Sequence, residues 1–545
     1  MPFLRFSFTN QACRNGRINL LWALLLGAVS LICLMILLMR LGTRSGQTDG
    51  DALVVYAAAG MRIPVEEIAQ QYESEYGVSL EIQYNGSNTL LNQLQTDKFS
   101  EADIYLAADD FYTDKAIQLD LAVDTMPIAY QGPVIAVRKD AEKKIESLED
   151  LLQNDIRVAV ANPDQAAVGK AARRQLSAVR VGETSRWQQL EKHVTESGVF
   201  KPTVNDIATD VKIGTVDAAI VWNSTVAMPK YQEDLVAVAV PELDGDPDLI
   251  SVAVLRSSAD LPSAYRFARY VSARDRGLVT FAKYGTQSVD GDVWKEDPQI
   301  NFFCGAVNRR TTERIVEEFQ ADEGVAVNTI YDGCGILTSR MKGIEGQKQS
   351  QGFPDVYMAC DLHYLENVRT WFQEAANVSD VELVIAVPKG STKVRSLPDL
   401  VEPDVRVAVG EPTQCTIGAL TRRLLQKEGL YERFVEKQQQ GDEVTVIEKS
   451  SSAHLVPDVV TGHVDAAIAY VSDVLPNEDS VDVIRIESPL SVAIQPFSIA
   501  KTSPHKYLLR RLFKRIVNSP EAFESVGFRF RLGDASPDVT ENLAP

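Results

Sequence analysis

Four cysteines carry the most distinctive chemistry in this sequence, because thiols can bond to one another or to metals. The chain has six cysteines, and four of them fall in its second half: Cys304, Cys334, Cys360 and Cys415. They could form two disulfides in an oxidising compartment, hold a soft metal or cluster as thiolates, or shape a pocket as small buried groups. Their spacing is not that of a sequence-local zinc knuckle, so a metal site would depend on the fold. All four are therefore metal or disulfide candidates, and a soft metal or cluster is the one cofactor they suggest.

Histidines could add to this chemistry. His454 could supplement the cysteines, and a Cys334–His454 nucleophile pair is conceivable, although no motif supports it. We interpret His363 and His463 as surface or capping residues. The sequence has no recognisable catalytic triad, phosphate loop or zinc-protease motif, so we predict that the chain is not an enzyme.

A duplicated pattern of strands and helices must position the cysteines. Five landmarks recur in the same order, each as a pair of similar segments: 54–60 and 301–307, 84–88 and 331–335, 102–109 and 354–361, 157–163 and 406–412, and 216–222 and 464–470. In this register Cys334 takes the place of Ser87 and Cys360 that of Ala108. Cys304 and Cys415 also fall in turns at strand ends. We therefore expect the four cysteines to be neighbours in space.

Each copy reads as an α/β unit. Short runs of Val, Ile and Ala alternate with amphipathic stretches such as 65–76 and 312–322, the pattern of helices that cover a mainly parallel sheet. The length of 545 residues also requires several lobes. We predict a first domain at 52–290, a linker at 291–299, a second domain at 300–532 and a tail at 533–545, with two lobes in each domain.

One apolar run, residues 20–39, lies between Arg17 and Arg40 and carries no charge. It is long enough to span a bilayer, and its flanking arginines favour an N-terminus inside. We predict a cytoplasmic segment at 1–17, a transmembrane anchor at 18–40 and a linker at 41–51, which places both domains outside the inner membrane. The alternatives are a cleaved signal peptide, which the length of the run disfavours, and a lipoprotein signal at Cys33, which the preceding Ile32 disfavours.

The overall charge excludes one class of partner. A net charge of −20 and the lack of a basic stripe with interleaved aromatic residues argue against nucleic acid. A small anion is not excluded, because local dipoles and hydroxyls can hold it whatever the sign of the distant surface.

The five landmarks, repeated in order, resemble the type II periplasmic solute-binding proteins of ATP-driven importers, and in particular their molybdate- and tungstate-binding branch. The resemblance implies two tandem domains whose paired lobes close around a ligand at the carboxyl ends of the strands. It also implies a small oxyanion ligand and an ABC-type permease as partner. A tetrahedral dianion suits such a place, because helix N-termini and hydroxyls donate hydrogen bonds to it.

The resemblance carries five ligand-binding positions onto the first domain: Gly60, Ser87, Val168, Ile207 and Trp222. It implies a hydroxyl donor at Ser87 and backbone N–H donors at Val168 and Ile207. The branch usually has Tyr at Trp222 and a ligand Ser at Gly60, so this chain has one hydroxyl fewer.

Two of these positions, and one charged neighbour, have structural alternatives. Ser87 could instead cap a helix, and Trp222 could be a core aromatic residue. Arg62 lies near the mouth of the expected cleft, where it could pair with an anion, but we favour an ordinary surface residue.

The same carry-over gives the second cleft five positions: Val307, Cys334, Ile417, Leu455 and Tyr470. Since Cys334 replaces the Ser donor and Val307 replaces Gly60, we expect this cleft to have diverged in ligand. We therefore predict a membrane-anchored protein whose first domain binds a molybdate- or tungstate-like oxyanion for transport or sensing. The alternative function is a thiol, soft-metal or redox-sensing module centred on the second-domain cysteines.

Overall fold

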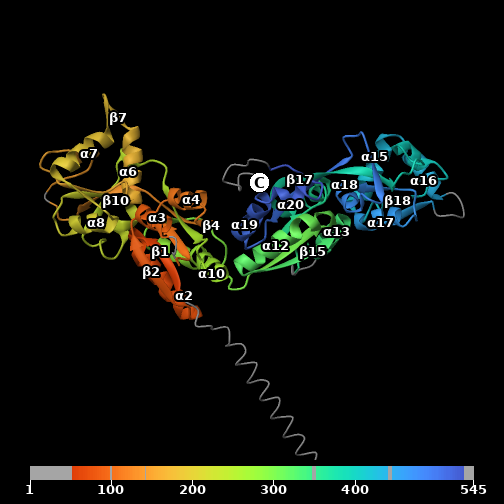
Figure 1. The fold of residues 1–545 in the computed structure, drawn as a ribbon. Helices are drawn as coiled ribbons and strands as arrows, with labels where there is room; N and C mark the ends of the chain where they lie inside the picture. The colour runs from red at the N-terminus through yellow and green to blue at the C-terminus, as the bar shows by residue number, and fades with distance from the viewer. Residues whose placement is uncertain (1–51, 98–100, 142, 346–351, 440–444, 533–545) are drawn as a thin grey trace, which may run out of the picture. The chain divides into compact units, whose positions relative to one another are not determined.

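The computed structural model describes residues 52–97, 101–141, 143–345, 352–439 and 445–532. The predicted anchor at 18–40 and the predicted tail at 533–545 lie outside the described residues. Within the described ranges no helix is both long and apolar enough to cross a membrane. In Figure 1 the first repeat runs from red to yellow-green and the second from green to blue.

The first lobe of repeat 1 is a six-stranded sheet in the order β13-β4-β12-β3-β1-β2. Its strands are β1 (Leu53–Ala58), β2 (Leu80–Asn85), β3 (Ile104–Ala107), β4 (Ala122–Gln131), β12 (Asp248–Leu255) and β13 (Gln287–Ser288). Its helices are η1 (Ala59–Met61), α2 (Arg62–Tyr76), α3 (Ser87–Thr96), α4 (Asp110–Gln118), α10 (Leu261–Val271) and α11 (Gly277–Lys283).

The second lobe of repeat 1 is a five-stranded sheet in the order β11-β5-β10-β6-β9. Its strands are β5 (Pro133–Arg138), β6 (Val158–Ala161), β9 (Val199–Lys201), β10 (Ala218–Trp222) and β11 (Leu235–Val238), and β7 (Arg180–Val181) pairs with β8 (Thr184–Ser185). Its helices are α5 (Leu148–Leu151), α6 (Ala167–Ala178), α7 (Arg186–Ser197), α8 (Val204–Lys212), α9 (Asn223–Ala227) and η2 (Pro241–Leu243).

Repeat 2 forms one ten-stranded sheet, because the long strand β17 runs through both of its lobes. Its strands are β14 (Gln299–Gly305), β15 (Ala326–Asp332), β16 (Val356–Met358), β17 (Phe372–Pro388), β18 (Val407–Gly410), β19 (Val446–Lys449), β20 (Ala466–Tyr470), β21 (Val481–Arg485), β22 (Val492–Ala500) and β23 (Arg529–Phe530). In repeat 1 the equivalent path is divided between β4 and β5, which Gly132 separates.

The helices of repeat 2 follow the same order as those of repeat 1. They are η3 (Ala306–Asn308), α12 (Arg309–Glu323), α13 (Cys334–Glu345), α14 (Leu362–Glu366), η4 (Arg369–Trp371), η5 (Leu397–Val401), α15 (Thr416–Lys427), α16 (Tyr431–Gln439), η6 (Ser452–His454), α17 (Leu455–Val460), α18 (Val471–Val474), η7 (Leu475–Asn477), α19 (Lys506–Val517) and α20 (Pro520–Glu524).

The sheets are mixed, which corrects the expectation of mainly parallel sheets. In the first lobe β1 pairs in parallel with β2 and β3, but β12 pairs antiparallel with both β3 and β4. The returning strand β22 makes the same antiparallel pairings with β16 and β17 in repeat 2. The alternation of strands and helices in the sequence predicts the parallel strands of each sheet. It does not indicate that one strand returns from the other lobe and pairs antiparallel.

Local sequence explains why equivalent elements begin and end together. Both α2 and α12 end at a glycine in the left-handed conformation, Gly77 at φ 69° and Gly324 at φ 62°, where a side chain would be strained. Strands β10 and β20 are apolar runs buried at every position, as central strands covered on both faces must be. The duplication is therefore structural as well as sequential.

The two repeats contact each other through a buried ion-pair cluster. Glu323 at the end of α12 accepts two hydrogen bonds from Arg511, Nε to Oε1 at 2.6 Å and Nη2 to Oε2 at 3.0 Å. It also accepts one from Nη1 of Arg269, in repeat 1, at 3.0 Å. All three side chains are less than a tenth exposed. Residues from Leu53 onward form one compact unit.

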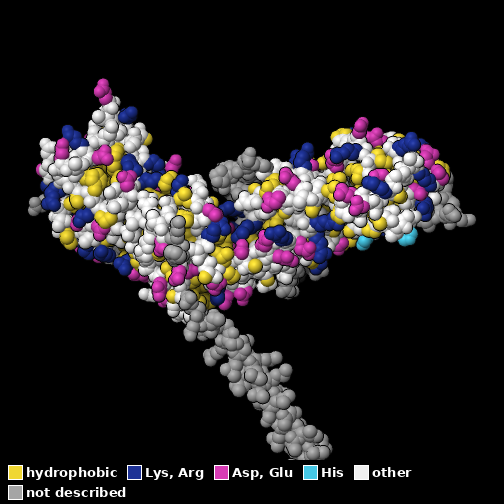
Figure 2. All heavy atoms as spheres, in the orientation of Figure 1, with side chains coloured by type: hydrophobic (Ala, Val, Ile, Leu, Met, Phe, Trp, Pro, Cys, Tyr) yellow, Lys and Arg dark blue, Asp and Glu magenta, His cyan; other side chains and the backbone are white. Residues whose placement is uncertain are grey.

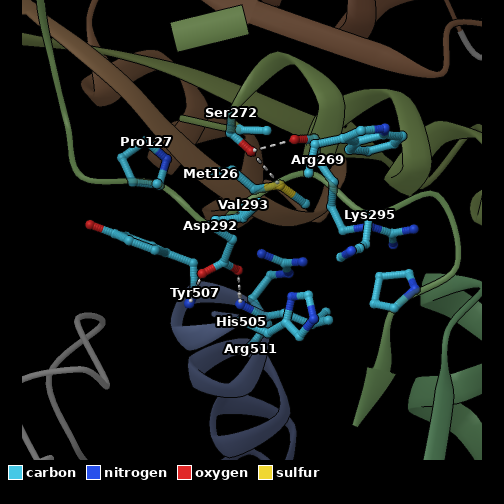
Figure 3. A pocket seen from close by; sticks show the side chains of 15 residues that line it. Met126, Pro127, Arg269, Ser272, Asp292, Val293, Lys295, His505, Tyr507 and Arg511 are labelled. Carbon is cyan, nitrogen blue, oxygen red and sulfur yellow. Dashed lines mark hydrogen bonds between the residues drawn. The ribbon is translucent and has the colours of Figure 1, made fainter. Parts of the chain in front are cut away.

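A cavity of about 450 Å³, part of it open to solvent, lies beside this cluster (Figure 3). Asp292 accepts hydrogen bonds there from the backbone N–H groups of Tyr507 and Leu508, each at 2.9 Å, in the first turn of α19. Trp294, in the segment predicted as a linker, donates from Nε1 to the Tyr76 hydroxyl at 2.7 Å. This cavity is therefore lined by residues that join the two repeats. It lies apart from the predicted clefts.

Candidate functional site

The predicted cleft of repeat 1 is a cavity of about 250 Å³ where the two lobes meet. It is lined by the ends of β1, β2, β3 and β10 and by the first residues of α3, α6 and α8. Four of the predicted positions, Gly60, Ser87, Val168 and Trp222, line it together. None of the residues that line it is charged. The surface is different, because acidic and basic side chains intermix on the face shown in Figure 2.

Ser87 is the first residue of α3 and is 1% exposed. The helix is capped by Gly86 without a side-chain hydrogen bond, so the alternative of Ser87 as the capping residue is wrong. Its Oγ accepts a hydrogen bond from the backbone N–H of Ala108 at 3.3 Å, and Tyr105 fixes its carbonyl oxygen from the other side at 2.7 Å. Because Oγ is held as an acceptor, its own O–H is free to donate toward the cavity.

Helix starts supply the other donors. Ala167 and Val168 open α6 on the side opposite Ser87, and their N–H groups belong to the first turn, which has no partner inside the helix. The amino ends of α3 and α8 meet the same cavity. Three helix N-termini that converge on an uncharged space favour a small anion there.

Gly60 and Trp222 set the shape of the cavity. A Cβ atom on Gly60 would lie 2.9 Å from Cγ1 of Val204 and 3.7 Å from Cδ1 of Trp222. A serine at position 60 would therefore require Val204 to move. Trp222 is only 2% exposed, so it lines the cavity and packs in the core at the same time.

Two residues near the cleft do not line it. Ile207 lies one turn inside α8, where its N–H already points to the carbonyl oxygen of Thr203 at 3.5 Å, and Thr203 and Val204 line the cavity instead. Arg62 bonds Glu66 on its own helix at 2.9 Å and lies over the Tyr84 ring, as an exposed surface residue.

Both clefts are closed in the structure. In repeat 1 the N–H of Asn88 donates across the cleft to the carbonyl oxygen of Gln165 at 3.2 Å. In repeat 2 the N–H of Gly335, at the equivalent place in α13, donates to the carbonyl oxygen of Gln414 at 3.1 Å. The same backbone contact therefore joins the lobes of each repeat.

The second cleft keeps this backbone but changes its side chains. The predicted positions Val307, Cys334, Ile417, Leu455 and Tyr470 are all buried. Cys334 starts α13 as Ser87 starts α3, and its Sγ accepts from the N–H of Cys360 at 3.0 Å, as Ser87 accepts from Ala108. The Cys334 thiol therefore takes the same position in the second cleft as the Ser87 hydroxyl takes in the first.

The four cysteines are free thiols, all buried. The sulfur atoms of Cys334 and Cys360 lie 2.7 Å apart. Cys304 faces the Thr312 hydroxyl at 3.7 Å, and Cys415 faces the carbonyl oxygens of Glu411 and Lys449 at 3.6 and 3.5 Å. In the part of the chain that the structure describes, no group of three or more His, Cys, Asp or Glu side chains could hold a metal ion. His454 is exposed, whereas Cys334 is fully buried.

Three buried hydroxyls around this thiol pair, those of Tyr357, Thr416 and Tyr470, have no hydrogen-bond partner among the described residues. Tyr357 is the equivalent of Tyr105, which does have one. The Tyr357 and Thr416 hydroxyls nevertheless lie close enough to Cys334 to help stabilise its thiolate. Sequence reasoning missed both residues, although Tyr357 occupies the same place in its landmark as Tyr105 does, and Thr416 directly follows Cys415.

The two thiols of the close pair ionise unequally. Burial opposes ionisation of Cys334, but the thiol and N–H of Cys360 and the nearby Tyr357 and Thr416 hydroxyls outweigh it and lower the pKa of the Cys334 thiol. Burial and the neighbouring Cys334 raise the pKa of the Cys360 thiol well above its usual range. Cys334 therefore loses its proton first, and Cys360 keeps its own.

Comparison with known proteins matches both repeats. A family model described as bacterial extracellular solute-binding protein matches residues 53–287 and again residues 300–529. A binding protein of Haemophilus influenzae is 30% identical over 208 residues, which cover 38% of this chain and 79% of that protein. The molybdate-binding protein ModA of Mycobacterium bovis is 26% identical over 232 residues, which cover 42% of this chain and 82% of that protein.

Among solved structures, the periplasmic molybdate-binding protein of Azotobacter vinelandii aligns with a TM-score of 0.35 and 16% identity, over 43% of this chain and 98% of that one. The relatives are described as binding proteins. The resemblance inferred from the five landmarks is confirmed, and in both copies.

Proposed function

Because the chain belongs to the bacterial extracellular solute-binding protein family, with two tandem copies of the type II periplasmic-binding fold, we propose that its first cleft binds a small tetrahedral oxyanion. Molybdate and tungstate are the ligands we favour, since one relative is described as a molybdate-binding protein. The proposal rests on the site at least as much as on the relative.

The observation that carries the proposal is the buried Ser87 hydroxyl, which lines an uncharged cavity surrounded by helix N-termini and whose O–H is free to donate there. A cationic ligand would find no carboxylate there, and a large apolar ligand would leave the N–H groups of α6 and α8 unsatisfied. A compact anion with several acceptor oxygens satisfies both the hydroxyl and the N–H groups. Because Gly60 supplies no hydroxyl, the cavity has one hydrogen-bond donor fewer, and it selects its ligand by shape.

We further propose that the bound ligand passes to an ABC-type permease or is reported to a sensing partner. The apolar run at 18–40 would hold the chain in the inner membrane, with both repeats on the extracytoplasmic side. Washing membranes with alkaline carbonate tests the anchor. The chain should stay in the pellet, and a variant that begins at residue 45 should be released.

A second candidate function is a thiol-based module in repeat 2, either redox-active or bound to a soft metal. It is favoured by the Cys334–Cys360 pair, which has no equivalent in repeat 1, where Ser87 and Ala108 stand. The two candidates concern different clefts and do not exclude each other.

Thermal melting of the full chain with molybdate, tungstate, sulfate and phosphate tests the first proposal. A ligand that binds only the folded state raises the melting temperature, and the rise grows with the logarithm of its concentration above Kd. We expect molybdate or tungstate to do so, and Ser87→Ala to weaken binding roughly 10- to 150-fold, since a hydrogen bond to a charged group contributes roughly 1.5–3 kcal/mol.

Ser197→Ala is the matched control, because Ser197 ends α7 and its Oγ donates to the carbonyl oxygen of His193, away from the cavity. It should bind as the unmodified chain does. Equal binding by Ser87→Ala, or no shift with any of the four oxyanions, would refute oxyanion capture by the first cleft.

A further inference from the structure

The sulfur atoms of Cys334 and Cys360 are brought together by two segments of one lobe. Cys334 is the first residue of α13, and Cys360 lies two residues after the end of β16. Their separation of 2.7 Å is within about 1 Å of the covalent distance in a disulfide, which is roughly 2.0 Å.

Gly305 makes room for the pair. A Cβ atom on Gly305 would lie 2.2 Å from Sγ of Cys360 and 2.8 Å from Sγ of Cys334, so any other residue would collide with both sulfurs. The equivalent residue in repeat 1 is Ala58, which lines the first cavity together with Ser87 and Ala108. The two thiols and the glycine that accommodates them are therefore three linked differences between the repeats.

The other two cysteines are engaged elsewhere. Cys304 faces the Thr312 hydroxyl, and Cys415 faces backbone carbonyl oxygens on the other lobe of the repeat. The lowered pKa of the Cys334 thiol also suits thiol chemistry, because the thiolate is the nucleophile in disulfide exchange.

We propose that Cys334 and Cys360 are a redox-active pair that forms a reversible disulfide in the second cleft by exchange with a small-molecule disulfide. The Cys334 thiolate attacks one sulfur of the oxidant, which forms a mixed disulfide and releases one thiol. Cys360 then attacks Cys334 Sγ, loses its proton and releases the second thiol. The two cysteines lose two electrons and two protons, and the oxidant gains both.

The disulfide changes what the second cleft can bind. In the reduced state Cys334 presents a thiol where repeat 1 presents the Ser87 hydroxyl, close to the unpartnered hydroxyls of Thr416 and Tyr470. In the oxidised state that donor is gone. Both cysteines belong to the same lobe, so the bond alters the floor of the cleft without tying the lobes together. This inference concerns repeat 2 and does not depend on the ligand of repeat 1.

Titration of the full chain with glutathione disulfide tests the pair. After each addition the remaining thiols are alkylated in denaturant, and the peptides are identified by mass spectrometry. We expect one cross-linked peptide, Cys334 to Cys360, which dithiothreitol reverses, while Cys304 and Cys415 stay alkylatable. The absence of this cross-link at every concentration, or an equal yield of links to Cys304 or Cys415, would overturn the proposal.

Single variants separate the pair from general thiol oxidation. In Cys360→Ser the Cys334 thiol should instead retain one glutathionyl group, whereas in Cys334→Ser, which lacks the nucleophile, Cys360 should stay alkylatable. Cys304→Ser is the matched control, a buried cysteine of the same repeat, and it should form the cross-link as the unmodified chain does. Thiols that resist alkylation until a metal chelator is added would identify the pair as metal ligands and overturn the disulfide.

Discussion

The two clefts share a backbone and differ in groups of side chains that compensate one another. Where repeat 1 has Ala58, Ser87 and Ala108, repeat 2 has Gly305, Cys334 and Cys360, and the smaller residue at the first position accommodates the larger ones at the other two.

A second exchange lies across the opening. Gly60 meets Val204 in repeat 1, while η3 with Val307 contacts η6, which begins at Ser452, in repeat 2. The difference teaches that, after duplication, side chains in contact with one another changed together while the backbone kept its arrangement.

Removal of the charge on Glu323 should have the largest effect on stability. Glu323→Gln leaves the buried guanidinium groups of Arg269 and Arg511 without their shared carboxylate, which costs about 3–5 kcal/mol when one partner of a buried pair is lost. Burial opposes ionisation of Arg511, and Glu323 holds the pKa of its guanidinium above the usual range. Without Glu323 the guanidinium stays charged because its ordinary pKa already lies far above neutral pH. Urea titration measures the loss in free energy of unfolding.

Glu318→Gln is the control on the same helix. Glu318 pairs with Arg314 at 2.7 Å, but both side chains are more than half exposed, so the change should be below about 0.5 kcal/mol. The Glu323→Gln variant also tests whether the two clefts depend on each other. If it leaves oxyanion binding by repeat 1 unchanged, the repeats bind independently.

The pH dependence of alkylation should distinguish the thiols of the second cleft. Burial raises the pKa of the Cys415 thiol to about 11, whereas that of Cys334 lies below its usual value. Since only the thiolate reacts, the Cys334 rate should level off at a lower pH, and at pH 8 its thiolate fraction should exceed that of Cys415. Rates from pH 6.5 to 10, read peptide by peptide, measure this. The Cys334 rate should approach its plateau within that range, whereas the Cys415 rate should still be rising at pH 10, and the shape of each profile does not depend on differences in access.

Ser87→Cys extends the same measurement to the first cleft. The new thiol would accept from the Ala108 N–H but would lack a neighbouring thiol donor, so its rate should level off at a higher pH than that of Cys334. Equal profiles would show that the neighbouring Cys360 does not favour the thiolate.

Gly305→Ala should destabilise repeat 2 by about 1–3 kcal/mol, because the added methyl group overpacks the two sulfurs. The loss should be relieved in Gly305→Ala combined with Cys334→Ser and Cys360→Ala, which recreates the arrangement of repeat 1. Gly343→Ala is the control in α13, where a Cβ would meet nothing within 4 Å. That change should instead stabilise the helix by roughly 0.5–1 kcal/mol.

Part of this comparison could be predicted from the sequence. The repeated landmarks place Cys334 opposite Ser87 and Cys360 opposite Ala108, because strand ends are marked by short apolar runs and the turns after them keep their length. The positions of Gly60, Val168 and Trp222 at one cavity follow from the same register.

The remaining features depend on three-dimensional contacts that no local pattern records. Thr203 caps α8 and so determines that Val204, and not Ile207, reaches the cavity. The pairing of Cys334 with Cys360 rather than Cys304 or Cys415 depends on side-chain direction at neighbouring strand ends. The role of Gly305 becomes visible only when the sulfurs around it are known, since glycine at a strand end can equally serve a tight turn or a close backbone approach.

The smallest expected effect concerns the opening between the lobes. Gly60→Val should hinder closure of the first cleft, because its side chain would meet Val204. The added change Val204→Ser should restore closure, because repeat 1 would then have a valine and a serine where repeat 2 has Val307 and Ser452.

Hydrogen exchange at the Asn88 N–H, which donates across the cleft to Gln165, reports closure without a ligand, and the Gly335 N–H gives the same reading for the second cleft of the same molecule. A closure penalty of about 1 kcal/mol would speed exchange at Asn88 roughly fivefold, and oxyanion affinity would fall by the factor by which the closed fraction falls. Gly335 should not change. If the double variant stays as open as Gly60→Val, the two size exchanges are unrelated, and the clefts diverged residue by residue instead of in matched sets.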